Sequence, residues 1–299
     1  MSTFTKKTAP ILILSAGALW GTLGIFVRTL SAFQLTSIQI AALRIAAGAV
    51  ILLAGTALLD REKLKIRLRD MGWFIGTGLC GILLFTVCYF KTISLASLSV
   101  AAILLYTAPI MVMLMSLALF REKMTKRKFL ALLTAFSGCV LVTGIGGDGR
   151  ISPAAVGFGL ASAFGYGLYS ILGSFALRRY SPITVTTYSF LCAGICSLII
   201  SDPGDICRKI QASPKPGNAL LCILLLAIVT AALPYLFYTI GLSSVRASSA
   251  SIMASVEPVV ATLAGRLVFG EALTVSSFVG IALVIAAVVI LNMPGPVQK

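Results

Sequence analysis

Long apolar segments separated by short polar ones run along the whole chain. Each is close to the roughly 20 residues that a helix needs to cross a bilayer. Lipid offers no partner for backbone polar groups, and the segments lack the alternation of a membrane β-barrel, so helices are predicted. The predicted spans are residues 10–27, 36–58, 71–91, 98–120, 128–146, 154–179, 182–201, 218–241, 247–269 and 275–293. The pattern predicts an all-α polytopic membrane protein with ten transmembrane helices.

Composition agrees with this pattern, because 59% of the 299 residues are hydrophobic and only 11% are charged. The longest stretch between spans, residues 201–217, contains Pro203, Pro214 and Pro216 and is expected to be a linker. The first apolar run follows Lys6 and Lys7, as in a signal peptide. Nine further spans downstream favour an uncleaved first helix.

The distribution of basic residues explains the net charge of +15. With the N-terminus in the cytoplasm, sixteen of the 24 basic residues lie on the inner side and six on the outer side. By the positive-inside rule, both termini are therefore expected in the cytoplasm. The basic loops are expected to contact anionic membrane lipid. This distribution does not favour a nucleic-acid partner.

The second half of the chain repeats the first at an offset of 149 residues. The matching pairs are Pro109 and Pro258, Phe120 and Phe269, Glu122 and Glu271, Thr125 and Thr274, and Phe129 and Phe278. The repeats are assigned to residues 1–147 (helices 1–5) and 148–299 (helices 6–10). Because each holds an odd number of spans, the second enters the membrane inverted. Inverted five-helix repeats are typical of transporters.

Among nine carboxylates, only Glu257 is predicted deep in the membrane, about 15 Å into the ninth span. A charge there costs several kcal/mol unless it is neutralised or paired, which marks a functional site. Glu257 either exchanges a proton and couples transport to it, or acts as counter-ion to a substrate ammonium group. The alternative is a hydrogen bond to a neighbouring helix that only fixes packing.

Three prolines inside predicted spans are expected to break or kink their helices. Pro109 and Pro258 remove backbone donors at equivalent points of the two repeats, and Pro234 adds a break in the eighth span. Broken helices at equivalent points of inverted repeats indicate a central binding site. We therefore predict hinges at Pro109, Pro234 and Pro258.

Arg44 is predicted inside the second span, where it cannot face lipid cheaply. As a substrate ligand it can bind a carboxylate through two parallel hydrogen bonds. The alternative is an arginine that caps carbonyls of neighbouring helices or extends to the outer headgroups.

Aromatic residues in the middle of spans are candidates for the wall of a substrate cavity, because buried hydroxyl groups need polar partners. Several rings around one anion suit an amine or aromatic substrate. Each residue could equally belong to the core. The candidates are Trp20, Tyr89, Tyr106, Tyr166, Tyr235 and Tyr238.

The groups needed for other functions are missing from the chain. It has no histidine, no pair of deep carboxylates and no deep lysine, which argues against a metal site, a cofactor and an intramembrane enzyme. No ring of charges or filter-like segment indicates a channel. A channel or an enzyme stays the remote alternative to a carrier.

Short motifs in both halves resemble the EamA family of the drug/metabolite transporter superfamily. They are Leu19-Trp20-Gly21, Leu43-Arg44, Ala108-Pro109 and Glu257-Pro258, with Phe-x-Glu before a threonine closing the fourth and ninth spans. The resemblance implies ten helices in two inverted repeats around a central cavity, in a bacterial inner membrane. It implies cavity or hinge roles for Trp20, Arg44, Pro109, Glu257 and Pro258, and helix-end roles for Glu122 and Glu271.

The hypothesis from the sequence is a secondary transporter of small metabolites, with amino acids or amine-bearing compounds the expected substrates. It works by alternating access, with export the favoured direction and Glu257 available for proton coupling. An uptake permease or facilitator of the same fold is the alternative. The expected partners are the substrate and membrane lipid, and the protein is a monomer or homodimer.

Overall fold

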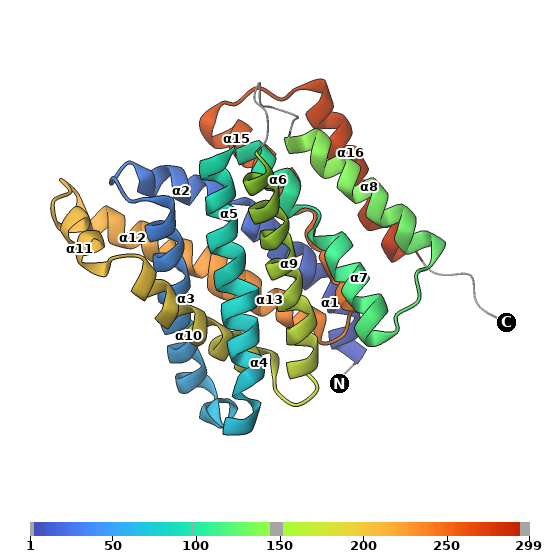
Figure 1. The fold of residues 1–299 in the computed structure, drawn as a ribbon, viewed down its shortest axis with the longest axis horizontal. Helices are drawn as coiled ribbons and strands as arrows, with labels where there is room; N and C mark the ends of the chain where they lie inside the picture. The colour runs from blue at the N-terminus through green and yellow to red at the C-terminus, as the bar shows by residue number, and fades with distance from the viewer. Residues whose placement is uncertain (1–2, 97, 144–151, 294–299) are drawn as a thin grey trace.

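The computed structural model describes residues 3–96, 98–143 and 152–293, which are helical with no strand. Figure 1 shows a bundle in which long helices cross at varied angles. The α-helices are α1 (Thr3–Gly21), α2 (Leu23–Ser31), α3 (Ser37–Leu59), α4 (Met71–Ile75), α5 (Leu84–Leu95), α6 (Leu98–Leu105), α7 (Ala108–Phe120), α8 (Lys126–Thr143), α9 (Pro153–Ala176), α10 (Pro182–Ile200), α11 (Pro203–Gln211), α12 (Pro216–Ala227), α13 (Leu233–Leu242), α14 (Ala247–Ala254), α15 (Glu257–Phe269) and α16 (Val275–Asn292). Two short 3₁₀ helices, η1 (Arg61–Leu64) and η2 (Leu68–Asp70), join α3 to α4.

Nine helical segments of the described chain are long and apolar enough to cross a membrane, which confirms the all-α polytopic fold. They are Thr8–Ser31, Ser37–Leu59, Leu68–Leu95, Val100–Phe120, Pro153–Ala176, Pro182–Ile200, Pro216–Leu242, Ala247–Phe269 and Val275–Asn292. The tenth expected span corresponds to α8, which opens with Lys126, Arg127 and Lys128, so its apolar part is shorter. The end predicted for this span and the boundary between the repeats, 147/148, lie outside the described residues.

The fourth and ninth spans are each broken in the middle, at equivalent positions. The bounds of α6 and α7, shifted by the 149-residue repeat, are those of α14 and α15. A tight turn closes each break: the amide of Thr107 donates to the carbonyl of Leu104 at 3.1 Å, and that of Val256 to Met253 at 3.3 Å. Pro109 and Pro258 are the second residues of the helices that follow, where a missing amide is tolerated.

The third and eighth spans share a different irregularity, a wider π-helical turn. It comprises η3 (Gly76–Leu83) between α4 and α5, and η4 (Ile228–Ala232) between α12 and α13. Pro234 is the second residue of α13, directly after η4, so a π-helical turn stands where the sequence predicted a break. Such turns inside helices occur frequently at functional sites.

The first and sixth spans, which are equivalent in the two repeats, differ in the continuity of their helices. The first is interrupted at Thr22, whose hydroxyl donates to the carbonyl of Leu19 at 2.7 Å, whereas α9 is continuous. The interruption lets α2 leave α1 at an angle over the end of α3, on the left of Figure 1. No expectation from the sequence included this break.

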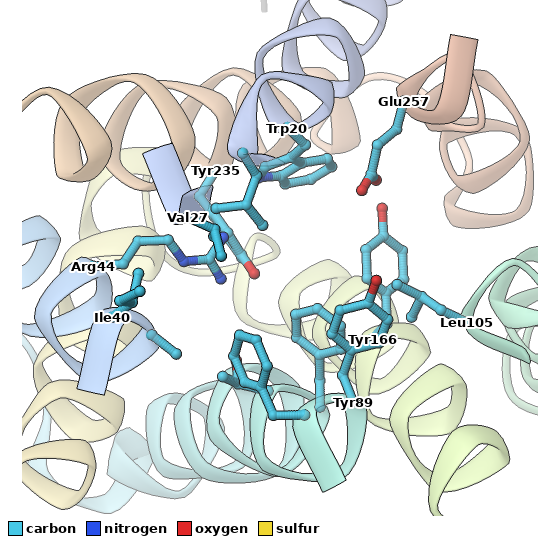
Figure 2. A pocket seen from close by; sticks show the side chains of 14 residues that line it. Trp20, Val27, Ile40, Arg44, Tyr89, Leu105, Tyr166, Tyr235 and Glu257 are labelled. Carbon is cyan, nitrogen blue, oxygen red and sulfur yellow. The ribbon is translucent and has the colours of Figure 1, made fainter. Parts of the chain in front are cut away.

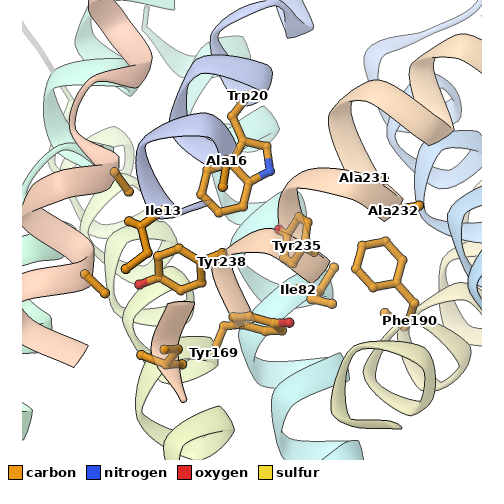
Figure 3. Packing of buried hydrophobic residues seen from close by; sticks show 14 of the residues in the cluster. Ile13, Ala16, Trp20, Ile82, Tyr169, Phe190, Ala231, Ala232, Tyr235 and Tyr238 are labelled. Carbon is orange, nitrogen blue, oxygen red and sulfur yellow. The ribbon is translucent and has the colours of Figure 1, made fainter. Parts of the chain in front are cut away.

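The packed centre of the bundle is aromatic. Trp20 of α1, Tyr169 of α9, and Tyr235 and Tyr238 of α13 lie together with small residues such as Ala16 of α1 between the rings (Figure 3). The Tyr169 hydroxyl bonds Thr239 at 2.8 Å, and the Tyr238 hydroxyl bonds Ser170 at 2.8 Å. The hydroxyls of Tyr169 and Tyr238 therefore both have a partner inside the core.

The segment 201–217 is not only a linker, contrary to the sequence expectation. It contains α11, whose side-chain cap Asp202 accepts from the amide of Asp205. Ile206 of α11 is buried in a cluster with Leu30 and Ile40, so the helix docks on the ends of α2 and α3. Pro203 and Pro216 begin α11 and α12, where a proline is tolerated, and Pro214 lies between these two helices.

Candidate functional site

A cavity lies where the first, second, third and ninth spans meet beside α9 and α13. Its wall joins α1, α2, α3, α5, α6, α9, α13 and α15. It includes six of the predicted residues: Trp20, Arg44, Tyr89, Tyr166, Tyr235 and Glu257. Figure 2 shows Arg44 and Glu257 on opposite sides, with aromatic side chains between them. The space open to water-sized molecules is about 60 Å³, far less than the roughly 300 Å³ of a small-molecule pocket.

Glu257 is the first residue of α15, immediately after the break in the ninth span. The helix start points backbone amides at this region, which favours a negative charge there. Its carboxylate is half-buried, and among the described residues no side chain donates a hydrogen bond to it and no cation pairs with it. The hydrogen bond to a neighbouring helix, considered from the sequence, is not found in this part of the chain. The carboxylate is therefore available to a cavity ligand.

Gly21 brings α1 against the backbone of Glu257. A Cβ atom at Gly21 would lie 2.6 Å from the carbonyl oxygen of Glu257 and 2.9 Å from the amide nitrogen of Ala261. Only glycine allows this approach. The neighbouring Trp20 thereby lies beside the carboxylate on the cavity wall.

Arg44 projects from α3 into the opposite wall and is 6% exposed. Its guanidinium approaches the carbonyl of Thr230 in the π-helical turn η4 at 3.5 Å. Within the described residues Arg44 has no carboxylate partner. It contacts a carbonyl of a neighbouring helix and lines the cavity at the same time, so most of its donors remain available.

Aromatic rings hold one another in place between the two charged groups. Trp20 meets Tyr235 edge to face at 5.2 Å between ring centroids and Tyr166 at 6.0 Å. Phe85 meets Tyr166 at 5.8 Å and Tyr89 at 6.1 Å. Edge-to-face contacts restrict each ring, so the wall is largely preformed.

A second, smaller cavity lies on the other side of Glu257, next to both helix breaks. Tyr106, Pro109, Ser251 and Ser255 line it, and it shares Glu257 with the first cavity. Glu257 thus borders two cavities, and the smaller one is also lined by two serines. Pro109 is the predicted hinge that reaches a cavity wall.

The remaining predicted residues lie elsewhere. Tyr238 is 1% exposed and belongs to the core, with its hydroxyl bonded to Ser170. Pro234 and Pro258 are buried at the starts of α13 and α15 and line neither cavity. In the described residues no three His, Cys, Asp or Glu side chains come together as metal ligands.

Sequence reasoning missed most of the apolar wall and the serines. Helical spacing was the available signal, because residues three or four positions from Arg44 and Tyr89 share their faces. The residues missed are Leu23, Val27, Ile40, Ala41, Phe85, Thr86, Phe90, Leu105, Ser251 and Ser255. Their chemistry is common in any span, so composition could not single them out.

The chain is similar to known membrane proteins along almost its whole length. Its residues 7–144 and 153–293 match the model of the EamA-like transporter family. An uncharacterized transporter of Archaeoglobus fulgidus is 28% identical over 270 residues, which cover 86% of this chain and 88% of the relative. The uncharacterized transporter YwfM of Bacillus subtilis is 24% identical, with 97% and 95% covered.

A solved crystal structure has the same fold. It superposes with a TM-score of 0.79 at 19% sequence identity, covering 96% of this chain and 97% of the other. The family match over both halves and the many membrane-spanning helices show that this chain belongs to the EamA-like transporter family and is a multi-pass membrane transporter.

Proposed function

We propose that the protein is a secondary transporter of small metabolites that carry both an ammonium group and a carboxylate, such as amino acids, with simple amines as poorer substrates. The observation that carries the proposal is the placement of Arg44 and Glu257 on opposite walls of one cavity. A guanidinium binds a carboxylate through two parallel hydrogen bonds. The unpaired carboxylate of Glu257 suits an ammonium group.

The aromatic wall supports a substrate with an organic cation or an aromatic body. Trp20, Tyr89 and Tyr166 present ring surface near Glu257, where an ammonium group gains cation–π attraction. An apolar side chain would pack against Phe85 and Val27. Specificity then arises from the ammonium group and the carboxylate of the substrate, while the aromatic wall accepts several substrate side chains.

Alternating access follows from the closed state of the cavity and from the helix breaks. A volume of about 60 Å³ does not hold an amino acid, so the cavity must widen during transport. The breaks at residues 106–107 and 255–256, and the π-helical turns, are the points where the spans can bend. Pro109, Pro234 and Pro258 begin the helical halves that move.

Two carboxylates hold opposite ends of the bundle. Glu122 follows α7 and binds Lys128 and the hydroxyl of Ser248, at the start of the span 247–269. Glu271 lies just beyond the other end of that span and binds Arg28 at 2.5 Å. We call these two sets of contacts, at the repeat-related residues Glu122 and Glu271, latches. Each set of contacts breaks when its end of the bundle opens during transport.

Proton coupling follows from competition at Glu257. A carboxyl that borders both cavities can bind either a substrate ammonium group or a proton, and exchanging one for the other drives export. We place the protein in a bacterial inner membrane with both termini in the cytoplasm, in agreement with its basic loops.

Purified protein in proteoliposomes tests this function with a panel of labelled amino acids and amines. We expect saturable counterflow of amino acids and flux that responds to a pH gradient. Glu257→Gln, which keeps the shape of the side chain, should abolish proton-driven flux, while Glu62→Gln on the surface should not.

The outcomes separate the parts of the proposal. Flux that does not saturate would indicate a channel, and turnover of substrate would indicate an enzyme. Saturable counterflow that ignores the pH gradient would remove the proton role of Glu257 and leave its counter-ion role. Unchanged counterflow in Glu257→Gln would overturn both roles.

A further inference from the structure

A basic cleft lies at the end of the bundle where α4 begins, away from the substrate cavity. This end of the bundle is at the bottom of the view in Figure 1. It has a volume of about 540 Å³ and lies between the connection from α3 to α4 and the residues that follow α9. Four cationic side chains line it, with a single carboxylate: Lys65, Arg67, Arg69, Arg179 and Asp70.

The carboxylate in this cleft is already engaged. Asp70 is 5% exposed and accepts hydrogen bonds from Arg179 at 2.9 Å and from the Tyr180 hydroxyl at 2.8 Å. The backbone amide of Arg67 donates to the same hydroxyl at 3.1 Å. These hydrogen bonds link the connection between α3 and α4 to the residues that follow α9. The walls of the cleft are therefore held in a defined position.

The remaining positive charge is uncompensated. Arg67 and Arg69 are exposed, and no carboxylate of the described residues pairs with either. Lys65 pairs with Glu62 at 2.6 Å, but both side chains are about three-quarters exposed, which makes that pair weak. Two guanidinium groups therefore line one cleft without a salt bridge to a carboxylate, which is an arrangement that binds phosphate oxygens.

The cleft lies at the boundary of the membrane. Leu68, between the two arginines, is 85% exposed and opens the third span, Leu68–Leu95. An exposed leucine flanked by two arginines fits a position where acyl chains meet headgroups. Basic pockets between spans at this depth bind lipid headgroups.

We propose that this cleft binds the phosphate of an anionic phospholipid, with Arg67 and Arg69 as its ligands and Leu68 in contact with an acyl chain. Free phosphate presents the same oxygens but gains nothing from Leu68. The lipid is therefore the occupant, and the site stabilises the connection between α3 and α4 against the end of α9.

Native mass spectrometry and thermal unfolding of the purified full-length chain test the site with phosphatidylglycerol, phosphatidylcholine and inorganic phosphate as probes. We expect phosphatidylglycerol to bind and raise the unfolding temperature, and the other two to do neither at equal concentration. The double variant Arg67→Ala/Arg69→Ala should bind this lipid about tenfold or more weakly. Lys123→Ala/Lys126→Ala removes the same charge from another loop and should bind normally.

Equal binding of phosphatidylglycerol by both double variants would overturn the site, because the lipid would then be attracted by positive charge in general and not by this cleft. Equal stabilisation by inorganic phosphate would overturn the lipid as occupant. If Arg67→Ala/Arg69→Ala does not fold, Arg69→Gln alone should still weaken binding of phosphatidylglycerol. This test needs no transport substrate, so its failure leaves the proposed transport untouched.

Discussion

The proposed substrate site depends on individual residues that differ between the two repeats. Ala108 and Glu257 hold equivalent positions, each as the first residue of a helix after a break. Ala108 lies on the wall of the smaller cavity, and Glu257 lies between the two cavities. The repeat places the starts of α7 and α15 at the centre of the bundle. Only the start of α15 carries a carboxylate, so the two equivalent positions differ in charge. The proposed function therefore rests on this difference between the two halves.

The shape of the Arg44 side chain, and not only its charge, is expected to matter. Arg44→Lys keeps the positive charge but loses the planar fork that fits a carboxylate. We expect the KM for amino acids to rise about tenfold, with little change for amines that lack a carboxylate. Flux measurements on one matched pair, an amino acid and its decarboxylated amine, check this. An equal rise for both compounds would mean that Arg44 acts on the structure alone.

At the scale of elements, close helix contacts determine where functional groups lie. Gly21 lets α1 touch the backbone at the start of α15, and the motif Leu19-Trp20-Gly21 therefore has a packing role beside the ring of Trp20. At the rim of the bundle, Gln39 caps α3 by accepting from the amide of Thr36 at 3.0 Å and also reaches α11. Such contacts couple the helices that a transport cycle must move.

Gly21→Ala is expected to reduce transport by displacing α15. The added methyl group meets backbone atoms, which cannot rotate away, so the overlap costs about 1–3 kcal/mol. Gly24→Ala is the matched control, because nothing lies within 4 Å of a Cβ atom there. Thermal unfolding and counterflow of both variants check the prediction. Equal behaviour of the two variants would show that α1 has room to move.

The docking of α11 is expected to depend on the charge of Asp205. Hydrogen bonds from Lys209 and Gln39 lower the pKa of this carboxyl below its ordinary 3.8. Its contribution to stability is thus full above pH 3.8 and is lost as the pH falls through the lowered pKa. Asp205→Asn should lower the unfolding temperature near neutral pH.

A comparison of Asp205→Asn with the native protein at acidic pH is the control for this prediction. Below the lowered pKa the native carboxyl is also neutral, so the two unfolding temperatures should converge. A difference that persists unchanged at the lowest pH would mean that Asp205 acts through its shape and not its charge.

At the scale of the whole molecule, the two latches differ in strength. The side chains of Glu122 and Lys128 are 5% and 9% exposed, whereas those of Glu271 and Arg28 are 47% and 52% exposed. Removing one partner of a buried pair costs about 3–5 kcal/mol, while an exposed pair contributes at most about 1. We therefore expect the end held by Glu122, which also bonds Ser248, to be the harder one to open.

Glu122→Gln is expected to shift the protein toward the state that is open at the Glu122 end. Ser251 lies one turn from Ser248 and is 1% exposed, so Ser251→Cys reports on opening there. Its reaction with a water-soluble maleimide should be faster with Glu122→Gln, measured in a background without the native cysteines. Glu271→Gln should change this rate little. Equal rates in all three proteins would exclude a latch at Glu122.

Much of the fold could be predicted from the sequence, because each span satisfies its backbone hydrogen bonds within itself. Apolar length marked nine of the spans, and Pro109 and Pro258 marked breaks that the structure contains. The interruption at Thr22 and the helix α11 escaped prediction. The first follows Gly21 but has no proline to mark it, and the second forms where Pro203 starts a helix that docks on its neighbours.

The sequence by itself determined that the chain crosses the membrane repeatedly, where its spans break, and which charged residues lie deep. Only the tertiary structure decided which side chains share a cavity. Arg44 and Glu257 face one another across it, while Tyr238, equally plausible from its position, is turned into the core against Ser170. The reason is physical: hydrophobic length and missing backbone donors are local properties, but the rotation of each helix about its axis is set by packing against distant parts of the chain.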